Sequence, residues 1–159
     1  MTRFLAGLGH PYGREAGVSL VEFALVLPLL LILLLGMLDF GKAFNYWNDT
    51  THLANEAARW AVVNKNPGGG TLQQYIQQQA DTQELRSGGT PSVPGPLQIC
   101  ISFPNGTANV GDPVHVTASL TYNWLPYLGT RIGITQTTIT GSSTMRLEAQ
   151  PTNYGAGCS

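Results

Sequence analysis

The sequence is short of charge, and the little charge that it carries is balanced between the two signs. Asp, Glu, Lys and Arg make up 11% of the 159 residues, where about a quarter is usual for a soluble protein. The formal net charge is only −1. A nucleic-acid-binding protein needs a basic face to neutralise phosphates, so we expect no nucleic-acid partner. The length allows one small domain and little else.

Cysteine is almost absent, which excludes the common cysteine-based sites. The only two, Cys100 and Cys158, are too far apart for a CxxC redox or zinc motif. In an oxidising compartment we expect them to form a disulfide, which on the chain-entropy model stabilises the fold by about 4 kcal/mol. The alternative is two unpaired thiols, one of them in a loose C-terminal tail.

Motifs for catalysis or ligand binding are also missing. The triple glycine at residues 68–70 is not followed by the Gly-Lys-Ser/Thr of a phosphate loop. His10, His52 and His115 share no metal-ligand spacing. Asp112 and His115 could join a serine in a triad, but such residues occur by chance in any chain of this size. We therefore expect a protein that is not an enzyme, with no metal, no cofactor and no small-molecule substrate.

Residues 18–38 form one nearly unbroken apolar run, interrupted only by Ser19 and Glu22 at its start. A helix of about 20 residues, rising ~1.5 Å per residue, spans the ~30 Å hydrocarbon core of a bilayer. Pro28 removes one backbone hydrogen bond, which membrane helices tolerate when neighbours satisfy the freed carbonyl. The run predicts a single transmembrane helix.

The charges that flank this run predict its orientation. Arg3 and Arg14 precede it, whereas Asp39 and Lys42 follow it. The positive-inside rule then places the N-terminus in the cytoplasm and the C-terminal part of the chain outside. A secretory signal peptide cleaved after Ala43 is an alternative, although its apolar core would be longer than the usual ~7–15 residues.

The most informative motif lies at the edge of the predicted membrane helix. A short polar leader ends at Gly17, a carboxylate follows at Glu22, and Phe23 comes next. This resembles the type IV prepilin processing signal, in the G-x-x-x-x-E-F form of the Tad (tight adherence) pilus proteins. The resemblance implies that a prepilin peptidase cleaves between Gly17 and Val18. It also implies that the new amine of Val18 pairs with Glu22 of a neighbouring subunit, because a charge in an apolar setting favours an opposite charge.

The same residues have a plainer interpretation. Ser19 and Glu22 have the spacing of a capping box for a helix that begins near Leu20. Gly17 would then be a simple helix breaker upstream. This interpretation leaves unexplained why a carboxylate is carried into the first turn of a membrane helix, where ionisable groups are costly.

Helical periodicity continues beyond the membrane segment. Apolar side chains at spacings of three and four predict a helix that ends near Asn64. Its predicted apolar face consists of Phe40, Phe44, Trp47, Thr51, Ala54, Ala58 and Ala61. The small residues Ala54, Ala57, Ala58 and Ala61 permit close approach of another element, and we expect them to pack on the sheet of the same domain, in preference to another subunit. Residues 71–85 predict a second, weaker helix that is rich in glutamine.

The C-terminal half of the chain predicts a small antiparallel sheet. After a loop at residues 87–96, apolar and polar side chains alternate along residues 97–103 and 114–122, as in strands with one buried face. Residues 132–147 predict a third, threonine-rich strand that is bent or interrupted at Gly141. The expected fold is α+β, with the long N-terminal helix packed on this sheet.

Residues 124–128 form a short aromatic and apolar stretch after the second predicted strand. Such a stretch suits a partner-binding edge or an aromatic belt at a membrane interface. The simpler interpretation, which we prefer, is a buried loop between strands.

Further stretches strengthen the family resemblance. They are Ala-Ala-Arg-Trp-Ala at residues 57–61, Gly-Asp-Pro-Val-His-Val at 111–116 and Ser-Ser-Thr-Met-Arg-Leu-Glu at 142–148. With the processing signal they resemble the TadE-like family over most of residues 17–148. The resemblance implies a minor pilin-like subunit of the Tad/Flp pilus machinery, which helps to initiate, prime or anchor the filament. The implied partners are prepilin peptidase, other major and minor pilins, and the assembly platform.

These observations predict three segments. Residues 1–17 are a cytoplasmic leader, residues 18–38 a transmembrane helix and residues 39–159 a periplasmic or extracellular α+β domain. The predicted location is the inner membrane, with incorporation into the pilus as an option. The major Flp pilin is little more than an N-terminal helix, so the longer chain favours a minor subunit. The alternative is an uncleaved, single-pass membrane protein with a periplasmic binding or sensor domain.

Overall fold

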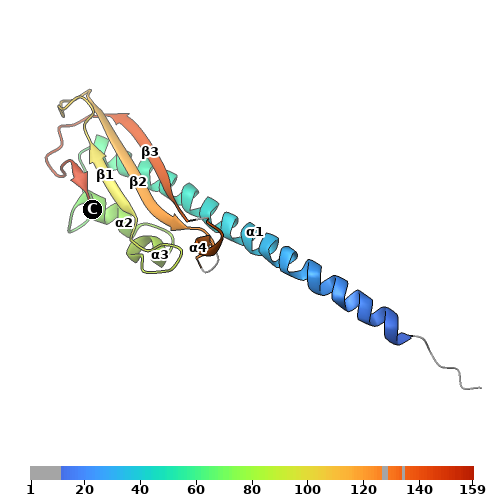
Figure 1. The fold of residues 1–159 in the computed structure, drawn as a ribbon. Helices are drawn as coiled ribbons and strands as arrows, with labels where there is room; N and C mark the ends of the chain where they lie inside the picture. Colours follow the sequence, from blue (N-terminus) through green and yellow to red (C-terminus); the bar gives the residue numbers. More distant parts are fainter. Residues whose placement is uncertain (1–11, 127–128, 134) are drawn as a thin grey trace, which may run out of the picture. The chain divides into compact units, whose positions relative to one another are not determined.

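The chain folds as an α+β protein with a long N-terminal helix, as the sequence predicts. The structure is a computed structural model and describes residues 12–126, 129–133 and 135–159. The chain divides into two compact units, of which the first ends at Leu38 and the second runs from Asp39 to Ser159. The elements follow in the order α1-α2-α3-β1-β2-α4-β3-β4 (Figure 1).

Helix α1 (Tyr12–Val62) contains the apolar run, including Pro28, and continues into the second unit. The predicted continuation of the helix is therefore confirmed. Just beyond it, Asn64 adopts a φ of 53°, and the Lys65 N–H donates to the Trp60 carbonyl at 3.0 Å. This left-handed turn satisfies a free carbonyl at the helix end, close to the predicted end at Asn64.

The face of α1 that packs on the sheet matches the predicted one only in part, because Ala54, Ala58 and Ala61 are buried as predicted but its three aromatic members are not. Phe40, Phe44 and Trp47 are 63%, 56% and 51% exposed. The buried face consists of Ala43, Tyr46, Thr50, Leu53, Ala54, Ala57, Ala58 and Ala61. Both sets recur at spacings of three and four, so periodicity alone could not distinguish them. The set with the smaller side chains faces inward because it lets the helix approach the sheet closely.

The single helix predicted for residues 71–85 is in fact two short helices. They are α2 (Leu72–Gln78) and α3 (Gln83–Ser87), and each begins at a threonine whose hydroxyl accepts a backbone N–H. Between them the Asp81 N–H donates to the carboxylate of Asp49 on α1 at 3.0 Å. The Asp81 N–H is therefore bonded to a side chain on α1, and the helix does not continue through this residue.

Four antiparallel strands form one sheet in the order β3-β2-β1-β4. They are β1 (Gln98–Ser102), β2 (Pro113–Asn123), β3 (Gln136–Arg146) and β4 (Gly157–Cys158). The three predicted strands are confirmed, and burial alternates along the whole of β2. Strand β4, at one edge of the sheet, was not predicted. Figure 1 shows the longer strands lying alongside the part of α1 that belongs to the same unit.

The third strand differs from its prediction in two respects. It begins at Gln136, because Ile132 belongs to the short helix α4 (Gly129–Ile132). It also runs without interruption through Gly141, which pairs with Ala118 of β2. The prediction of a break at this glycine was therefore wrong.

Gly141 is explained by the close approach of α1. The residue is buried, and a Cβ atom built on it would lie 2.5 Å from both the carbonyl carbon of Thr50 and the nitrogen of Thr51. No side chain fits between these two backbones, and a glycine within a strand often marks such a contact.

The hydrophobic core lies between α1, the two short helices and one face of the sheet. Besides the buried face of α1, its members include Leu72, Ile76, Leu85, Val93, Leu97, Ile99, Ile101, Val114, Val116, Leu120 and Tyr122. Beyond the sheet, the N–H groups of Glu148 and Ala149 donate to the Val62 carbonyl at 3.1 and 3.2 Å. The C-terminal end of α1 is thereby held to the domain.

Replacement of Gly141 with alanine should destabilise the domain. We expect a loss of about 2–3 kcal/mol in the free energy of unfolding, because the added methyl group must push the helix backbone off the strand. Denaturant unfolding of the full-length protein in detergent, followed by near-UV circular dichroism, measures this change.

Gly69→Ala is the matched control, because a Cβ atom there meets nothing within 4 Å. This variant should unfold like the wild type or at a slightly higher denaturant concentration. Equal stability of Gly141→Ala and Gly69→Ala would contradict the close backbone contact.

Candidate functional site

The predicted processing residues lie on one continuous helix. Gly17, Val18, Glu22 and Phe23 all belong to α1, and their side chains, or the Cα in the case of Gly17, are exposed. Val18 and Phe23 are 60% and 65% exposed. The leader prediction falls mostly on residues 1–11, which lie outside the described residues.

The capping-box interpretation of Ser19 and Glu22 is wrong. Helix α1 begins at Tyr12, five positions before Gly17, so Ser19 lies inside the helix and not at its N-terminus. Gly17 is likewise helical and is not a breaker. Helix capping therefore does not account for the carboxylate of Glu22.

A cluster of polar side chains lies where the second unit begins. The carboxylate of Asp39 accepts hydrogen bonds from the Tyr122 hydroxyl at 2.5 Å and from the Leu125 N–H at 2.8 Å. Burial, followed by this bond to a carboxylate, raises the pKa of Tyr122 well above its usual value. Tyr122 also packs edge-on against Trp124, with ring centroids 5.2 Å apart. Asp39 thus fixes the end of β2 and the following turn against α1.

A second group in this cluster is centred on Glu84 of α3. The Lys42 Nζ lies 2.8 Å from one carboxylate oxygen of Glu84, and the Tyr46 hydroxyl donates to the same carboxylate. The hydrogen bond from Lys42 and then that from Tyr46 hold the pKa of Glu84 below its ordinary value. Burial, followed by the bond to Glu84, raises the pKa of Tyr46. Both charged side chains that follow the apolar run, Asp39 and Lys42, therefore have partners inside the domain.

This geometry also bears on the alternative cleavage after Ala43. Ala43 is 6% exposed and lies within α1. Cleavage after it would remove Asp39 and Lys42 and their contacts with Tyr122 and Glu84. A released domain beginning at Phe44 would lose these interactions, which argues against the secreted form.

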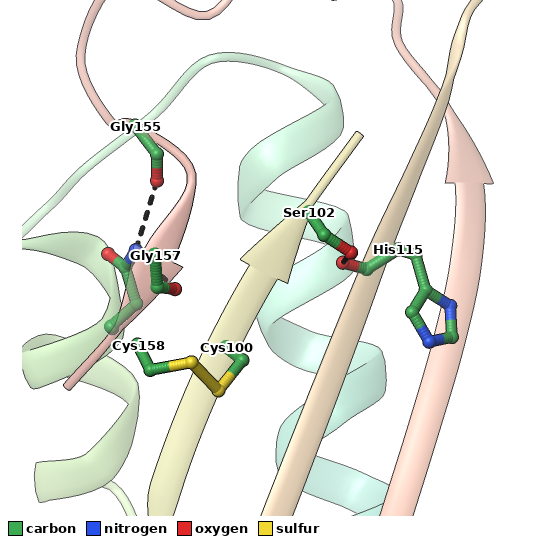
Figure 2. Close-up of a disulfide and its surroundings, with 7 residues drawn as sticks. Cys100, Ser102, His115, Gly155, Gly157 and Cys158 are labelled. Atoms are coloured by element: carbon green, nitrogen blue, oxygen red, sulfur yellow. Dashed lines mark hydrogen bonds between the residues drawn. A yellow bond between two sulfur atoms is a disulfide. The ribbon is translucent and has the colours of Figure 1, made fainter. Parts of the chain in front are cut away.

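Cys100 and Cys158 are joined by a disulfide between β1 and β4, with their Cα atoms 4.0 Å apart (Figure 2). The amide of Gln73, on α2, donates to the carbonyls of Gly155 and Gly157 at 3.0 and 3.3 Å. The C-terminal tail is therefore held at the sheet edge by a covalent bond and two hydrogen bonds, and it is not loose.

The residues considered for a catalytic triad are not brought together. Asp112 accepts hydrogen bonds from the Thr107 hydroxyl and the Asn109 N–H, at 2.7 and 2.9 Å. These bonds hold the pKa of Asp112 below its usual range. The Nδ1 of His115 instead lies 2.7 Å from Thr144 Oγ1. Within the described part of the chain, no three His, Cys, Asp or Glu side chains are grouped to hold a metal ion.

Sequence reasoning missed the polar cluster around Asp39 and Glu84. Its hydrogen-bonded partners are 38 to 86 residues apart in the sequence, so no local spacing reveals them. The one available signal was that Asp39 and Lys42 follow an apolar run directly, and we used it only for orientation.

Residues 17–59 match the family model described as TadE-like protein. The match confirms the resemblance inferred from the sequence, and it associates the chain with the Tad pilus system. It begins at Gly17 and ends at Arg59, so the motifs beyond Arg59 remain predictions. Within the described residues, α1 is also long and apolar enough to cross a membrane. No curated protein matches the chain, and no solved structure does.

Substitution of Glu84 with glutamine should reduce stability at neutral pH and should alter its dependence on pH. Because the folded-state pKa of Glu84 is lowered, its contribution is present above its ordinary pKa and is lost as the pH falls through the folded pKa. The wild type should exceed Glu84→Gln by about 1 kcal/mol at pH 7, since the pair is partly exposed. This difference should disappear once the pH falls below the lowered folded-state pKa of Glu84. Urea unfolding across this pH range measures it.

Glu148→Gln is the matched control, because no described side chain pairs with Glu148 and its side chain is exposed. This variant should follow the wild type at each pH. A Glu84→Gln deficit that stayed constant from pH 7 to low pH would indicate lost packing and would contradict the ion pair.

Removal of the disulfide should destabilise the domain and release its C-terminal tail. The bond closes a sequence separation of 58 residues, which corresponds to about 4 kcal/mol of stabilisation on the chain-entropy model. The double variant Cys100→Ser, Cys158→Ser should therefore unfold at a much lower denaturant concentration. Hydrogen exchange should show rapid exchange of the Ser159 N–H, which donates to Ile99.

The control is wild-type protein treated with a reductant, which should match the double variant. An unchanged midpoint together with a protected Ser159 N–H would show that the tail is held without the disulfide.

Proposed function

We propose that the chain is a minor pilin-like subunit of a Tad/Flp pilus. In this proposal, residues 1–17 are a cytoplasmic leader that prepilin peptidase removes by cleaving between Gly17 and Val18. Residues 18–38 span the inner membrane, and residues 39–159 form the outer domain. The observation that carries the proposal is the TadE-like match, which begins at Gly17 and runs through the apolar helix.

The position of Glu22 supports a role in assembly. Its carboxylate is exposed on α1 and has no partner among the described residues. An ionisable group near the edge of an apolar segment is costly unless it has a cationic partner. Cleavage would create such a partner, the amine of Val18, on a neighbouring subunit. Pairing of Glu22 with that amine would set the register of adjacent helices.

The disulfide supports the proposed location of the domain. Disulfides persist in oxidising compartments such as the bacterial periplasm and are rare in the cytosol. The bond between Cys100 and Cys158 therefore agrees with an outer domain and with a cytoplasmic leader that carries Arg3 and Arg14.

The size of the domain favours a minor subunit over the major pilin. Residues 39–159 form a domain with its own sheet and core. Such a domain can cap or prime the filament, or dock it on the assembly platform. TadE-like proteins are structural, so we propose no catalytic role.

Cleavage should depend on prepilin peptidase and on Gly17. Protein recovered from membranes of a peptidase-positive strain should begin at Val18, and protein from a peptidase-deficient strain should begin at Met1. Gly17→Leu should block cleavage, because a large side chain then precedes the scissile bond. N-terminal sequencing or mass spectrometry of the intact protein reads out each case.

Glu22→Ala is the matched variant that separates cleavage from assembly. It should still be cut but should yield few pili, which electron microscopy counts. Normal pilus number in this strain would contradict the charge-register role. A mature wild-type protein that retains Met1 would instead support an uncleaved membrane protein with a periplasmic sensor domain.

A further inference from the structure

The first turns of α1 in the outer domain have an inverted distribution of polarity. Phe40, Phe44 and Trp47 are each more than half exposed, whereas Asp39 and Lys42 are turned to partners within the domain. A helix surrounded by water buries its aromatic side chains and exposes its charges. The opposite arrangement indicates that water is not the medium that this face meets.

The exposed rings form part of a larger apolar surface. Phe44 and Trp47 pack together with ring centroids 5.7 Å apart. With Phe40 they border a groove of about 430 Å³, which Trp124 and Ile139 line as well. We name Phe40, Phe44, Trp47 and Trp124 the aromatic collar. Contiguous apolar surfaces of this kind mark interaction sites.

The position of the collar in the chain indicates what covers it. Phe40 lies two residues after Leu38, the end of the apolar run, so even a fully extended chain places it within about 7 Å of that point. The interfacial layer on each side of the hydrocarbon core is about 5–8 Å thick. If residues 18–38 span the membrane, Phe40 therefore lies in or next to this layer.

The remaining collar residues lie further from the apolar run. Trp47 is nine residues after Leu38, which is about 14 Å along a helix, so its Cα lies beyond this layer. Helical side chains lean toward the N-terminus, and membrane helices tilt by about 20° on average, so the ring reaches back toward the outer edge of the layer. Tryptophan combines an apolar ring with an N–H donor and is enriched at membrane interfaces. Asp39 is hydrogen-bonded by Tyr122 and Leu125, and Lys42 is paired with Glu84, which lowers the cost of placing these two charged groups near lipid.

We infer that the aromatic collar is a lipid-binding surface, by which the outer domain rests in the interfacial layer of the bilayer before assembly. The inference rests on the proposed membrane span at residues 18–38. The collar restricts how far the domain can rise from the membrane. A subunit that leaves the membrane must then transfer these rings from lipid to another apolar surface.

Quenching of tryptophan fluorescence by brominated lipids tests the inference. The full-length protein is reconstituted in phosphatidylcholine–phosphatidylglycerol vesicles whose acyl chains carry bromine either next to the glycerol backbone or at the chain ends. One variant (Trp60→Phe, Trp124→Phe) retains Trp47 as its only tryptophan. A matched variant (Trp47→Phe, Trp124→Phe) retains Trp60, which lies about 20 Å further along α1. Bromine next to the glycerol should remove about half or more of the Trp47 emission and little of the Trp60 emission.

A reporter in the span distinguishes failure of this inference from failure of the proposed function. Leu31→Trp, in a chain whose three tryptophans are replaced by phenylalanine, should be quenched by bromine at the chain ends. If Leu31→Trp is quenched but Trp47 is not, the span stands and the collar inference is overturned. If Leu31→Trp is not quenched, the span and the inference both fail.

Further measurements test whether each variant is folded and whether something other than lipid covers the aromatic collar. Trp47→Phe together with Trp124→Phe should remove most of the shallow-bromine quenching seen in the wild-type chain, because both collar tryptophans are then gone, and an unchanged quenching would overturn the inference. Blue-shifted Trp47 emission without quenching would mean that a second copy of the chain covers the collar, which also overturns it. Retention of the Cys100–Cys158 disulfide and of the far-UV circular dichroism spectrum shows that each variant is folded.

Discussion

The backbone of α1 lies directly on strand β3 at Gly141, and the arrangement of the outer domain depends on this contact. A Cβ atom at Gly141 would lie 2.5 Å from the Thr50 carbonyl carbon, so nothing larger than hydrogen fits between the two backbones. Beside this contact the helix face that continues from Thr50 is lined mainly by small side chains, of which Ala54, Ala57 and Ala58 have no exposed surface. The large aromatic side chains on the next face are consequently turned outward. The same constraint thus produces both a tight core and an exposed aromatic surface.

The elements that could be predicted from sequence were those set by local patterns. Buried and partly buried residues alternate along the whole of β2. This alternation could be predicted because each side chain of a strand faces either the core or the opposite side of the sheet. The first part of the inward face of α1 could not be predicted in this way, since its Ala43, Tyr46 and Thr50 recur at the same spacings of three and four as the exposed Phe40, Phe44 and Trp47. A glycine in a strand can mark a bend or a close contact with another backbone. At Gly141 the answer depends on the position of α1, which the local sequence does not indicate. The same limit applies to β4, whose two residues are a strand only because β1 and the disulfide hold them.

Of the candidate site, the sequence predicted a processing motif but not the polar cluster. Gly17 and Glu22 stand out in the sequence because the function proposed for them depends on their spacing along one helix. Asp39 acts through Tyr122, which is 83 residues away, so its role arises only on folding. The cluster places the start of the domain directly after the apolar run. Because Asp39 and Lys42 bond to other parts of the domain, these two residues of α1 are structural members of the outer domain.

The domain at residues 39–159 and the apolar part of α1 satisfy their charged groups in different ways. This difference suggests how the contact between subunits is made specific. The domain at residues 39–159 satisfies its first two charged groups internally, because Tyr122 hydrogen-bonds Asp39 and Glu84 pairs with Lys42. The apolar helix carries Glu22, which no described residue pairs with. An internally satisfied domain gains little electrostatic energy from a neighbour, whereas a lone carboxylate in an apolar setting gains much from one cation. Under the proposed function, the membrane segment therefore supplies the charge that selects the register between subunits. The outer domain contributes mainly apolar surface, which favours contact without fixing a register.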